Sequence, residues 1–555
     1  MKFEEMPYER VEEEKVKEEF AALMAAFGEA KSGSEQFAVH QRFYTLTDHV
    51  MTEMTLAEIR HDIDMTDEFY RAEQDYYDRL RPVLQNLMVE YQKKLYMSPF
   101  RAYLEEKIGK VAFKNIELAM RSTDPSLVEL MQEENALQTR YNVLLATAEI
   151  DWHGETKNLS LMTPYLHHAD RQIRKEAWEK YSAFFVKNEE EIEDIYDQLV
   201  RNRTKQAQTL GQENYLTLGY DRMMRNCYDR DMVAEFRRQV KKDLVPFAGQ
   251  LHERRRKRLG LSGLSFIDEG VYFPNGNPDP ILSPEEILAK GRQMYRELSP
   301  ETGEFMDFMC DNGLFDVLGR KTKKTGGYMT YLPDYHSPFV FANFNGTSGD
   351  VDVITHECGH AFQGFLSGRD PIREHADITM ETAETHSMSM EFFTEPWMKL
   401  FFGDRYQDYL EMHLEDSVIF IPYGTMVDEF QDIMYANPGL TPAARNQVWR
   451  DLERQYKPHL DYTGNEFYEK GGFWQKQHHI FDCPLYYIDY CIAGANALQY
   501  KNRMDKDFRE AFESYLKLCK LSASGFFTEL IADAGLDNPF EDGCLKHIVS
   551  GLMKC

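Results

Sequence analysis

The residues with the clearest potential for chemistry are His356, Glu357 and His360, which form the pattern His-Glu-x-x-His. Two histidines four residues apart lie on one face of a helix, about one turn apart, so both imidazoles can reach one metal ion. Imidazole nitrogens suit zinc, and zinc lowers the pKa of a water that it binds. Glu357 lies beside the first histidine and can take the proton of that water. The pattern therefore predicts a hydrolytic centre with one zinc ion.

A catalytic zinc ion needs a third protein ligand and an open position. The longer pattern His-Glu-x-x-His-x-x-Gly-x-x-His is absent, because Gln363 and Leu366 stand where it has glycine and histidine. A later glutamate is the other common solution, and residues 377–388 are predicted to form a helix that carries Glu381 and Glu384 on one face. One of them could bind the metal while the other accepts a hydrogen bond from a ligand histidine. Their spacing leaves open which does which.

A second group of chemically capable residues lies much further along the chain, where His479, Tyr486 and Tyr490 recur at helical spacing. Hydrolysis of a peptide bond develops negative charge on the former carbonyl oxygen. A phenol O–H or an imidazole N–H aimed at that oxygen stabilises it by about 3–4 kcal/mol per donor. The alternative interpretation is that aromatic side chains at this spacing pack in the core.

The elements that must position these residues are mainly helices, because most of the chain has the apolar period of an α-helix. Residues 326–347 differ, since aromatic and β-branched residues bounded by Pro and Asn-Gly predict a small antiparallel sheet. This sheet leads directly into the helix with the metal pattern. Gly359 and Gly364 within that helix cost about 1 kcal/mol each against alanine, which indicates that another element approaches closely. The predicted fold class is mainly α, with one small sheet beside the metal-binding helix.

The predicted sheet could also bind substrate, because an exposed strand edge can pair with an extended peptide through backbone hydrogen bonds. The candidate substrate-binding residues are Gly327, Tyr328, Phe341 and Asn343. The alternative is an ordinary structural hairpin.

Composition excludes several kinds of partner. The chain has 555 residues and a formal charge of −29, which disfavours nucleic acid and anionic membranes. The basic run at residues 254–258 is interpreted as a solvated helix end. The first residues lack the apolar region of a signal peptide, and no stretch is apolar enough to span a bilayer. Eight cysteines without a Cys-x-x-Cys pair indicate reduced thiols in a cytoplasmic protein. The sequence gives no indication of oligomeric state.

Three motifs together resemble the oligoendopeptidase F group of the thimet oligopeptidase family. They are HECGHAFQ, then METAETHSMSMEFF, then HHIFDCPLYYIDY, and the likeness covers roughly residues 200–555. The resemblance implies that Glu384 is the third metal ligand and that Glu381 supports the ligands. It also implies that His479, Tyr486 and Tyr490, with Tyr487 as an alternate, stabilise the oxyanion.

The same resemblance implies a mainly helical, two-lobed fold with a deep central channel that admits short peptides and excludes folded proteins. We accordingly expect a helical N-terminal lobe over residues 1–200 and a catalytic region over residues 201–555. The expected function is a zinc endopeptidase that hydrolyses oligopeptides. The alternatives are a zinc carboxypeptidase of similar helical fold and a catalytically silent relative that only binds peptides.

Overall fold

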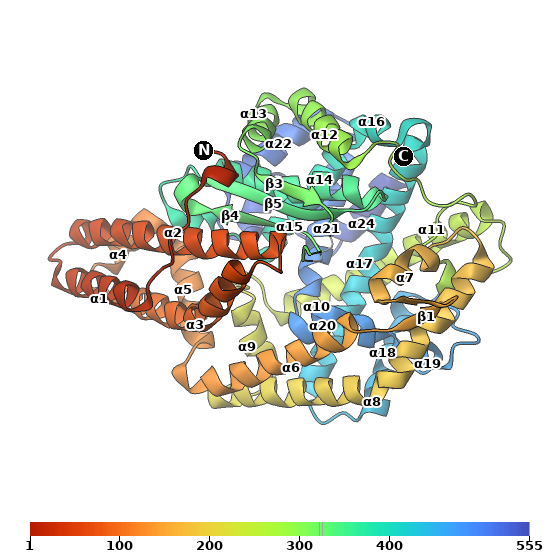
Figure 1. Ribbon diagram of the computed structural model, residues 1–555, viewed down its shortest axis with the longest axis horizontal. Coiled ribbons are helices and arrows are strands. Elements are labelled where there is room, and N and C mark those ends of the chain that lie inside the picture. The colour runs from red at the N-terminus through yellow and green to blue at the C-terminus, as the bar shows by residue number, and fades with distance from the viewer. Residues whose placement is uncertain (321, 325, 554–555) are drawn as a thin grey trace. The chain divides into compact units, whose positions relative to one another are not determined.

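The computed structural model of the protein describes residues 1–320, 322–324 and 326–553 and is mainly helical, as predicted. Two small sheets account for the strands of this part of the chain (Figure 1). Among the described residues, every helix is too short or too polar to cross a lipid bilayer.

Two compact units make up the chain, and each is assembled from separate segments. Unit 1 combines residues 1–120, 279–406 and 499–536, and unit 2 combines residues 121–278, 407–498 and 537–553. The boundary expected near residue 200 falls inside the unbroken helix α8 (Arg171–Thr209). The division into an N-terminal lobe and a catalytic region stays a prediction.

The helices of unit 1 are α1 (Glu13–Glu29), α2 (Gly33–Ile63), α3 (Glu68–Tyr96), α4 (Arg101–Ile108), α12 (Pro284–Leu298), α13 (Pro300–Asp311), α14 (Ser348–Ser367), α15 (Met380–Phe393), α16 (Lys399–Phe402), α22 (Phe508–Leu521) and α23 (Phe527–Asp533). The helices of unit 2 are α6 (Val128–Ala146), α7 (Leu159–Leu166), α8 (Arg171–Thr209), α9 (Tyr215–Arg222), α10 (Arg230–Gln239), α11 (Val245–Arg258), α17 (Tyr406–Ala436), α18 (Pro442–Tyr456), α19 (Glu466–Glu469), α20 (His478–Asp482) and α24 (Cys544–Leu552). Helices α5 (Lys110–Ser122) and α21 (Tyr487–Met504) contribute residues to both units, and so does α17, whose first residue, Tyr406, belongs to unit 1.

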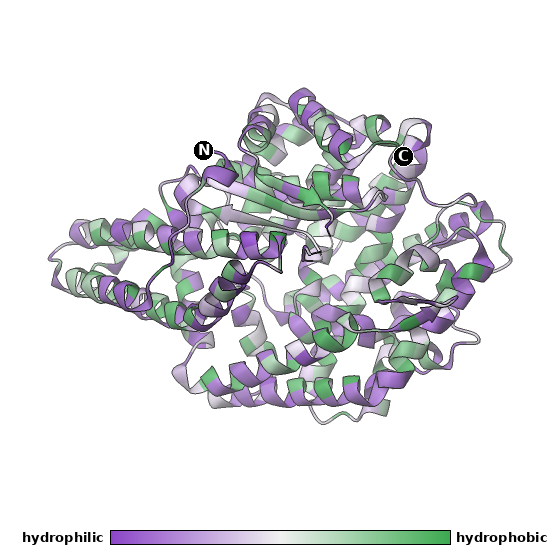
Figure 2. Ribbon diagram, in the orientation of Figure 1, coloured by the Kyte–Doolittle hydropathy of each residue, from purple (hydrophilic) through white to green (hydrophobic). Residues whose placement is uncertain are grey.

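The first three helices of unit 1 pack side by side (Figure 1). Helix α1 buries Val16, Phe20, Leu23 and Phe27, which lie on one face because they are spaced by three or four residues. Figure 2 shows the resulting alternation of hydrophilic and hydrophobic residues along these helices. Burial of such a stripe is what stabilises long helices in water.

The sheet of unit 1 has three strands in the order β3 (Phe315–Leu318), β5 (Ser337–Phe344) and β4 (Tyr328–Leu332). Strands β4 and β5 are antiparallel, as predicted, whereas β3 runs parallel to β5, so the sheet is mixed. The sequence analysis missed β3 because its four residues are too few to show a strand period. The central strand β5 is buried along most of its length.

Strand β5 passes directly into α14, the helix with the metal pattern. The carboxylate of Asp350 accepts the backbone N–H groups of Asn345 (2.9 Å) and Gly346 (2.8 Å) and so closes the turn between strand and helix. An acidic side chain in the first turn also complements the positive end of the helix dipole.

Helices α14 and α15 make the closest approach in unit 1, and the reason lies at Gly359. A Cβ atom on Gly359 would lie 2.6 Å from the Cα of Ser387 on α15. The close neighbour expected from this glycine is therefore present. At Gly364 the nearest contact of such an atom would be an ordinary 3.5 Å, to the ring of Tyr331.

Helix α22 packs against both of these helices. The hydroxyl of Tyr515 donates to the carbonyl of His386 on α15 at 2.9 Å. The amide of Gln363 on α14 donates to the hydroxyl of Ser522, just beyond α22, at 2.9 Å. Residues from the last tenth of the chain thus hold the helix pair in place.

In unit 2, the basic run at residues 254–258 ends α11 but is not simply solvated, so this interpretation needs correction. Arg255 is 1% exposed and lies over the ring of Tyr272, with 4.1 Å between guanidinium carbon and ring centroid. Arg258 pairs with Glu415 at 2.8 Å. Sequence alone does not reveal these partners, because they come from distant segments. Arg255 and Arg258 serve internal packing and ion pairing, whereas Arg254 and Lys257 are exposed, as the interpretation has it.

A buried arginine fixes the segment that contains the distal histidine. Arg203 on α8 is fully buried and donates to the carboxylate of Glu134 (2.6 Å) and the hydroxyl of Tyr435 (2.8 Å). It also donates to the carbonyls of Ile480 and Phe481 on the short helix α20. These bonds satisfy carbonyls that a five-residue helix leaves unpaired.

Candidate metal centre

Helices α14 and α15 bring together His356, His360 and Glu384. The carboxylate oxygen Oε2 of Glu384 lies 3.4 Å from Nε2 of His356 and 3.6 Å from Nε2 of His360. All three ligand atoms lie within 4.8 Å of one another. The two imidazole rings are nearly perpendicular, at 84°, with their centroids 5.0 Å apart. Three donors in this arrangement can converge on one ion.

Each of these three side chains also forms a hydrogen bond with a group outside the trio. Nδ1 of His356 lies 2.6 Å from Oε1 of Glu391, and the ring of His360 hydrogen-bonds the backbone carbonyl of Ala383. The hydroxyl of Ser387 donates to Oε2 of Glu384 at 3.2 Å. Such outer contacts leave Nε2 of each imidazole to bind metal, which is the usual arrangement around a protein-bound zinc ion.

The electrostatics of the two histidines differ. Burial alone would lower the pKa of His356, but hydrogen bonds to Glu384 and Glu391 raise it well above its usual value. Burial lowers the pKa of His360 to about 4, against the smaller opposing effect of Glu384. The carboxylates around His356 and His360 favour a positive charge between the two imidazoles, and a divalent cation would provide this charge.

Glu357 is placed by the sheet as well as by its own helix. Its carboxylate accepts a hydrogen bond from the backbone N–H of Met329 on β4. Burial raises the pKa of Glu357, and the carboxylates of Glu384 and Glu391 raise it further. A carboxylate with raised proton affinity beside a metal site is suited to general-base chemistry near neutral pH. Its neighbour Cys358 is fully buried.

The supporting carboxylate that the structure brings to His356 is Glu391, which the sequence analysis did not propose. Glu391 lies seven residues after Glu384, so both sit on one face of α15, and this spacing was the available signal. Glu381 accepts a hydrogen bond from the hydroxyl of Thr379 at 2.6 Å. A supporting role for Glu381 stays a prediction.

We expect Glu391→Gln to weaken metal binding by about 10- to 100-fold, because an amide supports the imidazole of His356 less well than a carboxylate does. Competition with a fluorescent chelator measures the affinity. Glu304→Gln, at an exposed residue paired with Arg369, is the matched control and should bind metal like the wild type. Equal affinity of the Glu391→Gln and wild-type proteins would contradict this role.

The candidate substrate-binding side chains have structural contacts. Phe341 is fully buried and stacks on the ring of Tyr328 (centroids 4.9 Å apart), whose hydroxyl donates to Asp62 at 2.9 Å. The amide of Asn343 donates to the carbonyls of Lys324 and Gly326. The substrate role of these side chains stays a prediction. The backbone edge of β4 is the part of the sheet that reaches Glu357.

The distal residues form one cluster within unit 2. The ring of His479, on α20, lies 4.8 Å from that of Tyr487 and 5.9 Å from that of Tyr486. The rings of Tyr486 and Tyr490 are 4.7 Å apart. Leu485 adopts a left-handed conformation with φ of 68°, and α21 begins two residues later, at Tyr487.

A second group of possible ligands in unit 2, His252, Glu269 and His459, has a geometry that does not suit a metal. The two imidazoles are stacked, with centroids 3.5 Å apart and planes 25° apart, so their in-plane lone pairs do not converge. Nζ of Lys457 lies 2.7 Å from Oε2 of Glu269 and already neutralises it. The sequence analysis missed this group because its members are far apart in the chain.

This stack predicts sensitivity to acid. Burial lowers the pKa of His252 to about 2, so the folded protein keeps this ring neutral whereas the unfolded chain protonates it below about 6.5. The stabilisation is complete above pH 6.5 and is lost as the pH falls towards 2. Between pH 6.5 and 5 we expect His252 to lower the free energy of unfolding by roughly 1.5 kcal/mol, and His252→Phe should abolish this contribution. Denaturant unfolding at both pH values measures it, and equal pH dependence of the two proteins would contradict it.

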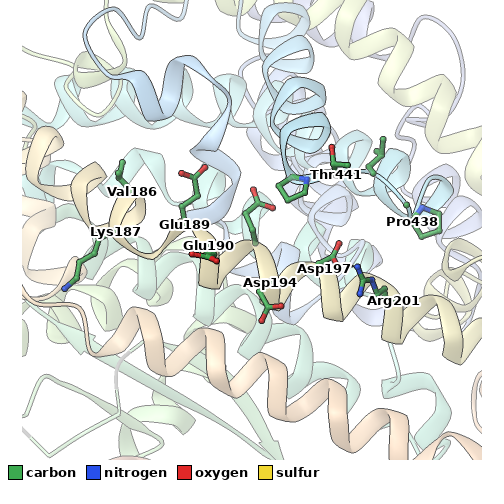
Figure 3. A pocket seen from close by; sticks show the side chains of 13 residues that line it. Val186, Lys187, Glu189, Glu190, Asp194, Asp197, Arg201, Pro438 and Thr441 are labelled. Atoms are coloured by element: carbon green, nitrogen blue, oxygen red, sulfur yellow. Dashed lines mark ion pairs between the residues drawn. The ribbon is translucent and has the colours of Figure 1, made fainter.

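A surface hollow of about 760 Å³ lies elsewhere in unit 2 and contains none of the metal-centre residues. It is lined by acidic side chains of α8, among them Glu189, Asp194 and Asp197, and by the segment from Pro438 to Pro442 (Figure 3). Glu189 pairs with Lys470 at 2.7 Å and Asp194 with Arg140 at 3.2 Å. These ion pairs mark a charged surface.

Comparison with known protein families shows the class to which this helical chain belongs. The family description "Peptidase M3 N-terminal domain" matches residues 3–123, and "Peptidase family M3" matches residues 304–550. This chain therefore belongs to peptidase family M3. The resemblance inferred from the three motifs is thus confirmed.

Individual relatives agree with this membership. An oligoendopeptidase F homolog of Lactococcus lactis is 21% identical over 374 residues, which are 66% of this chain but only 60% of the relative. The solved structure of PZ peptidase A with an inhibitor is 45% identical, with a TM-score of 0.94 over 100% of this chain and 98% of the other. An oligoendopeptidase F of Enterococcus faecium shares the fold at 16% identity, with a TM-score of 0.61 over 98% of this chain and 96% of the other.

Proposed function

We propose that this protein is a zinc-dependent endopeptidase that hydrolyses internal peptide bonds of oligopeptides in the cytoplasm. The convergence of His356, His360 and Glu384 beside the carboxylate of Glu357 carries the proposal. Membership of a peptidase family and the names of the relatives support the peptidase activity. The seven cysteines that the structure describes form no disulfide with one another, which fits a reducing compartment.

The donor set fits zinc. Two imidazoles and one carboxylate are a common ligand set of catalytic zinc sites, and the outer contacts of both imidazoles match the pattern around such sites. When bound, the ion would supply Lewis acidity, which acidifies a water molecule and polarises the peptide carbonyl. His356, His360 and Glu384 would hold it.

Glu357 would carry out the proton transfers of the reaction. Its carboxylate would take a proton from the attacking water and later deliver it to the leaving amine. The N–H of Met329 holds one side of this carboxylate and keeps it aligned with the edge of β4. Positioning of this kind lowers the entropic cost of bringing base and substrate together.

The edge of β4 is a suitable binding surface for an extended peptide. Strand β4 lies at the edge of its sheet, and the N–H of its residue Met329 bonds to Glu357. A peptide that pairs along this edge would therefore run past the general base. Backbone pairing selects extended, accessible chains with little demand on their sequence.

We assign stabilisation of the developing oxyanion to His479 together with Tyr486 or Tyr490. The support for this assignment is the chemistry of the cluster, which offers an imidazole N–H and phenol O–H groups on neighbouring residues. Loss of one such donor lowers kcat by about 10²- to 10³-fold in other hydrolases.

One peptide experiment tests the proposal. An internally quenched oligopeptide blocked at both ends should be cleaved by the zinc-loaded protein, should resist the protein treated with a chelator, and should be cleaved again after zinc is added back. Cleavage only of a peptide with a free C-terminus would indicate a carboxypeptidase instead. A zinc-loaded protein that binds both peptides and cleaves neither would overturn the enzymatic proposal.

A further inference from the structure

A glutamine beside the distal histidine has a hydrogen-bonding pattern that controls the proton on the imidazole ring. Gln477 immediately precedes α20, and its side chain does not cap that helix. The amide nitrogen Nε2 instead lies 3.0 Å from Nδ1 of His479. The amide oxygen Oε1 lies 2.6 Å from the hydroxyl of Tyr423 on α17.

The two distances indicate which way the amide points. Bonds between oxygen atoms are typically 2.5–3.0 Å long, whereas N–H···O bonds centre near 2.9–3.0 Å. The 2.6 Å contact to Tyr423 is therefore suited to the amide oxygen, and the 3.0 Å contact to His479 is suited to the amide nitrogen.

The count of donors and acceptors supports the same orientation. Gln477 also donates to the hydroxyl oxygen of Tyr487, so its two N–H groups serve His479 and Tyr487 while its oxygen accepts from Tyr423. In the reverse orientation, two amide hydrogens would face the single hydroxyl of Tyr423. One of those hydrogens would then lack an acceptor, which disfavours the reverse orientation.

Tyr423 is itself held in place. It lies on α17, and the ammonium of Lys457 lies over its ring, 5.2 Å from the centroid. Lys457 is anchored in turn by Glu269, at 2.7 Å. The hydroxyl that orients Gln477 therefore comes from a restrained side chain.

We propose that Gln477 is a positioning residue that fixes the tautomer of His479. An amide N–H can only donate, so Nδ1 of His479 must accept, and a neutral imidazole with an accepting Nδ1 carries its hydrogen on Nε2. Given the proposed function, on which this inference rests, Gln477 keeps an N–H on Nε2 for the reacting carbonyl oxygen.

Gln477→Glu is the informative substitution, because a carboxylate of the same size can only accept. Nδ1 of His479 must then carry a hydrogen. Nitrogen NMR of protein with ¹⁵N-labelled histidine reports which ring nitrogen is protonated, and comparison with a His479→Gln sample identifies the signal. We expect the wild type to be protonated on Nε2 and the variant to be protonated on Nδ1.

Kinetics provide the second measurement. We expect Gln477→Glu to lower kcat for the blocked oligopeptide by about 10²-fold with little change in KM, because the lost donor acts on the transition state. Tyr423→Phe removes the hydroxyl that orients the amide and should give a smaller loss in kcat. Gln455→Glu, the same change at an exposed residue of α18, is the matched control and should match the wild type.

The outcomes separate this inference from the proposed function. A wild-type protein protonated on Nδ1 of His479 would overturn the inference, and so would a loss of kcat in Gln477→Glu without a change of tautomer. A wild-type protein that shows the Nε2 tautomer but cleaves no peptide would support the assignment of Gln477 and refute the proposed function.

Discussion

Replacement of Glu357 by Gln is expected to lower kcat for a blocked oligopeptide by about 10²- to 10⁴-fold while bound zinc stays at one ion per chain. Glutamine has nearly the same size and keeps an oxygen that can accept the N–H of Met329, so the local structure should survive. The amide cannot take a proton from water, so the substitution removes the proposed general base and leaves the proposed metal ligands unchanged.

Steady-state kinetics give kcat, and metal analysis of the same sample gives the amount of bound zinc. Glu304→Gln controls for the loss of one negative charge at an exposed position and should retain full activity. Substantial turnover by a zinc-loaded Glu357→Gln protein would refute the assignment of Glu357 as general base.

Gly359→Ala is expected to damage the metal centre without altering any ligand. The added Cβ would lie 2.6 Å from the Cα of Ser387 and 3.1 Å from the carbonyl oxygen of His386, and backbone atoms cannot move aside as a flexible side chain can. Helices α14 and α15 must then separate, which moves Glu384 away from the two histidines. Overpacking of this kind lowers the free energy of unfolding by about 1–3 kcal/mol.

Two measurements distinguish the consequences. Denaturant unfolding gives the stability, and chelator competition gives the zinc affinity. We expect the zinc affinity to fall at least roughly 10-fold, which is the effect of removing a hydrogen-bond partner of a metal ligand. Gly249→Ala on α11 is the matched control, because a Cβ there meets nothing within 4 Å and alanine is the better helix former by about 1 kcal/mol. A Gly359→Ala protein with wild-type stability and zinc affinity would contradict the close helix contact.

Most of the correct predictions about the candidate metal centre came from the spacing of residues along one helix. His356 and His360 are one turn apart, so their common face follows from helix geometry alone. Gly359 also indicated a close neighbour, because its presence in a helix is unfavourable without one. The mainly helical class followed from apolar periodicity in the same way.

The features that escaped prediction depend on partners far apart in the chain. Strand β3 pairs parallel to β5 across more than twenty intervening residues, which no local pattern reports. The partner of Arg258 is Glu415, and that of Gln477 is Tyr423. Glu391 was within reach of spacing arguments, but choosing among three carboxylates on one helix needs the position of the imidazole.

The order in which the chain is synthesised gives the placement of α22 a further consequence. The ribosome makes α14 and α15 well before residues 508–522, yet Tyr515 and Ser522 bond to this helix pair. Domains of this size tend to fold as units, so unit 1 cannot complete its core until these late residues have emerged. A chain released before residues 508–522 are made would lack these contacts with α14 and α15.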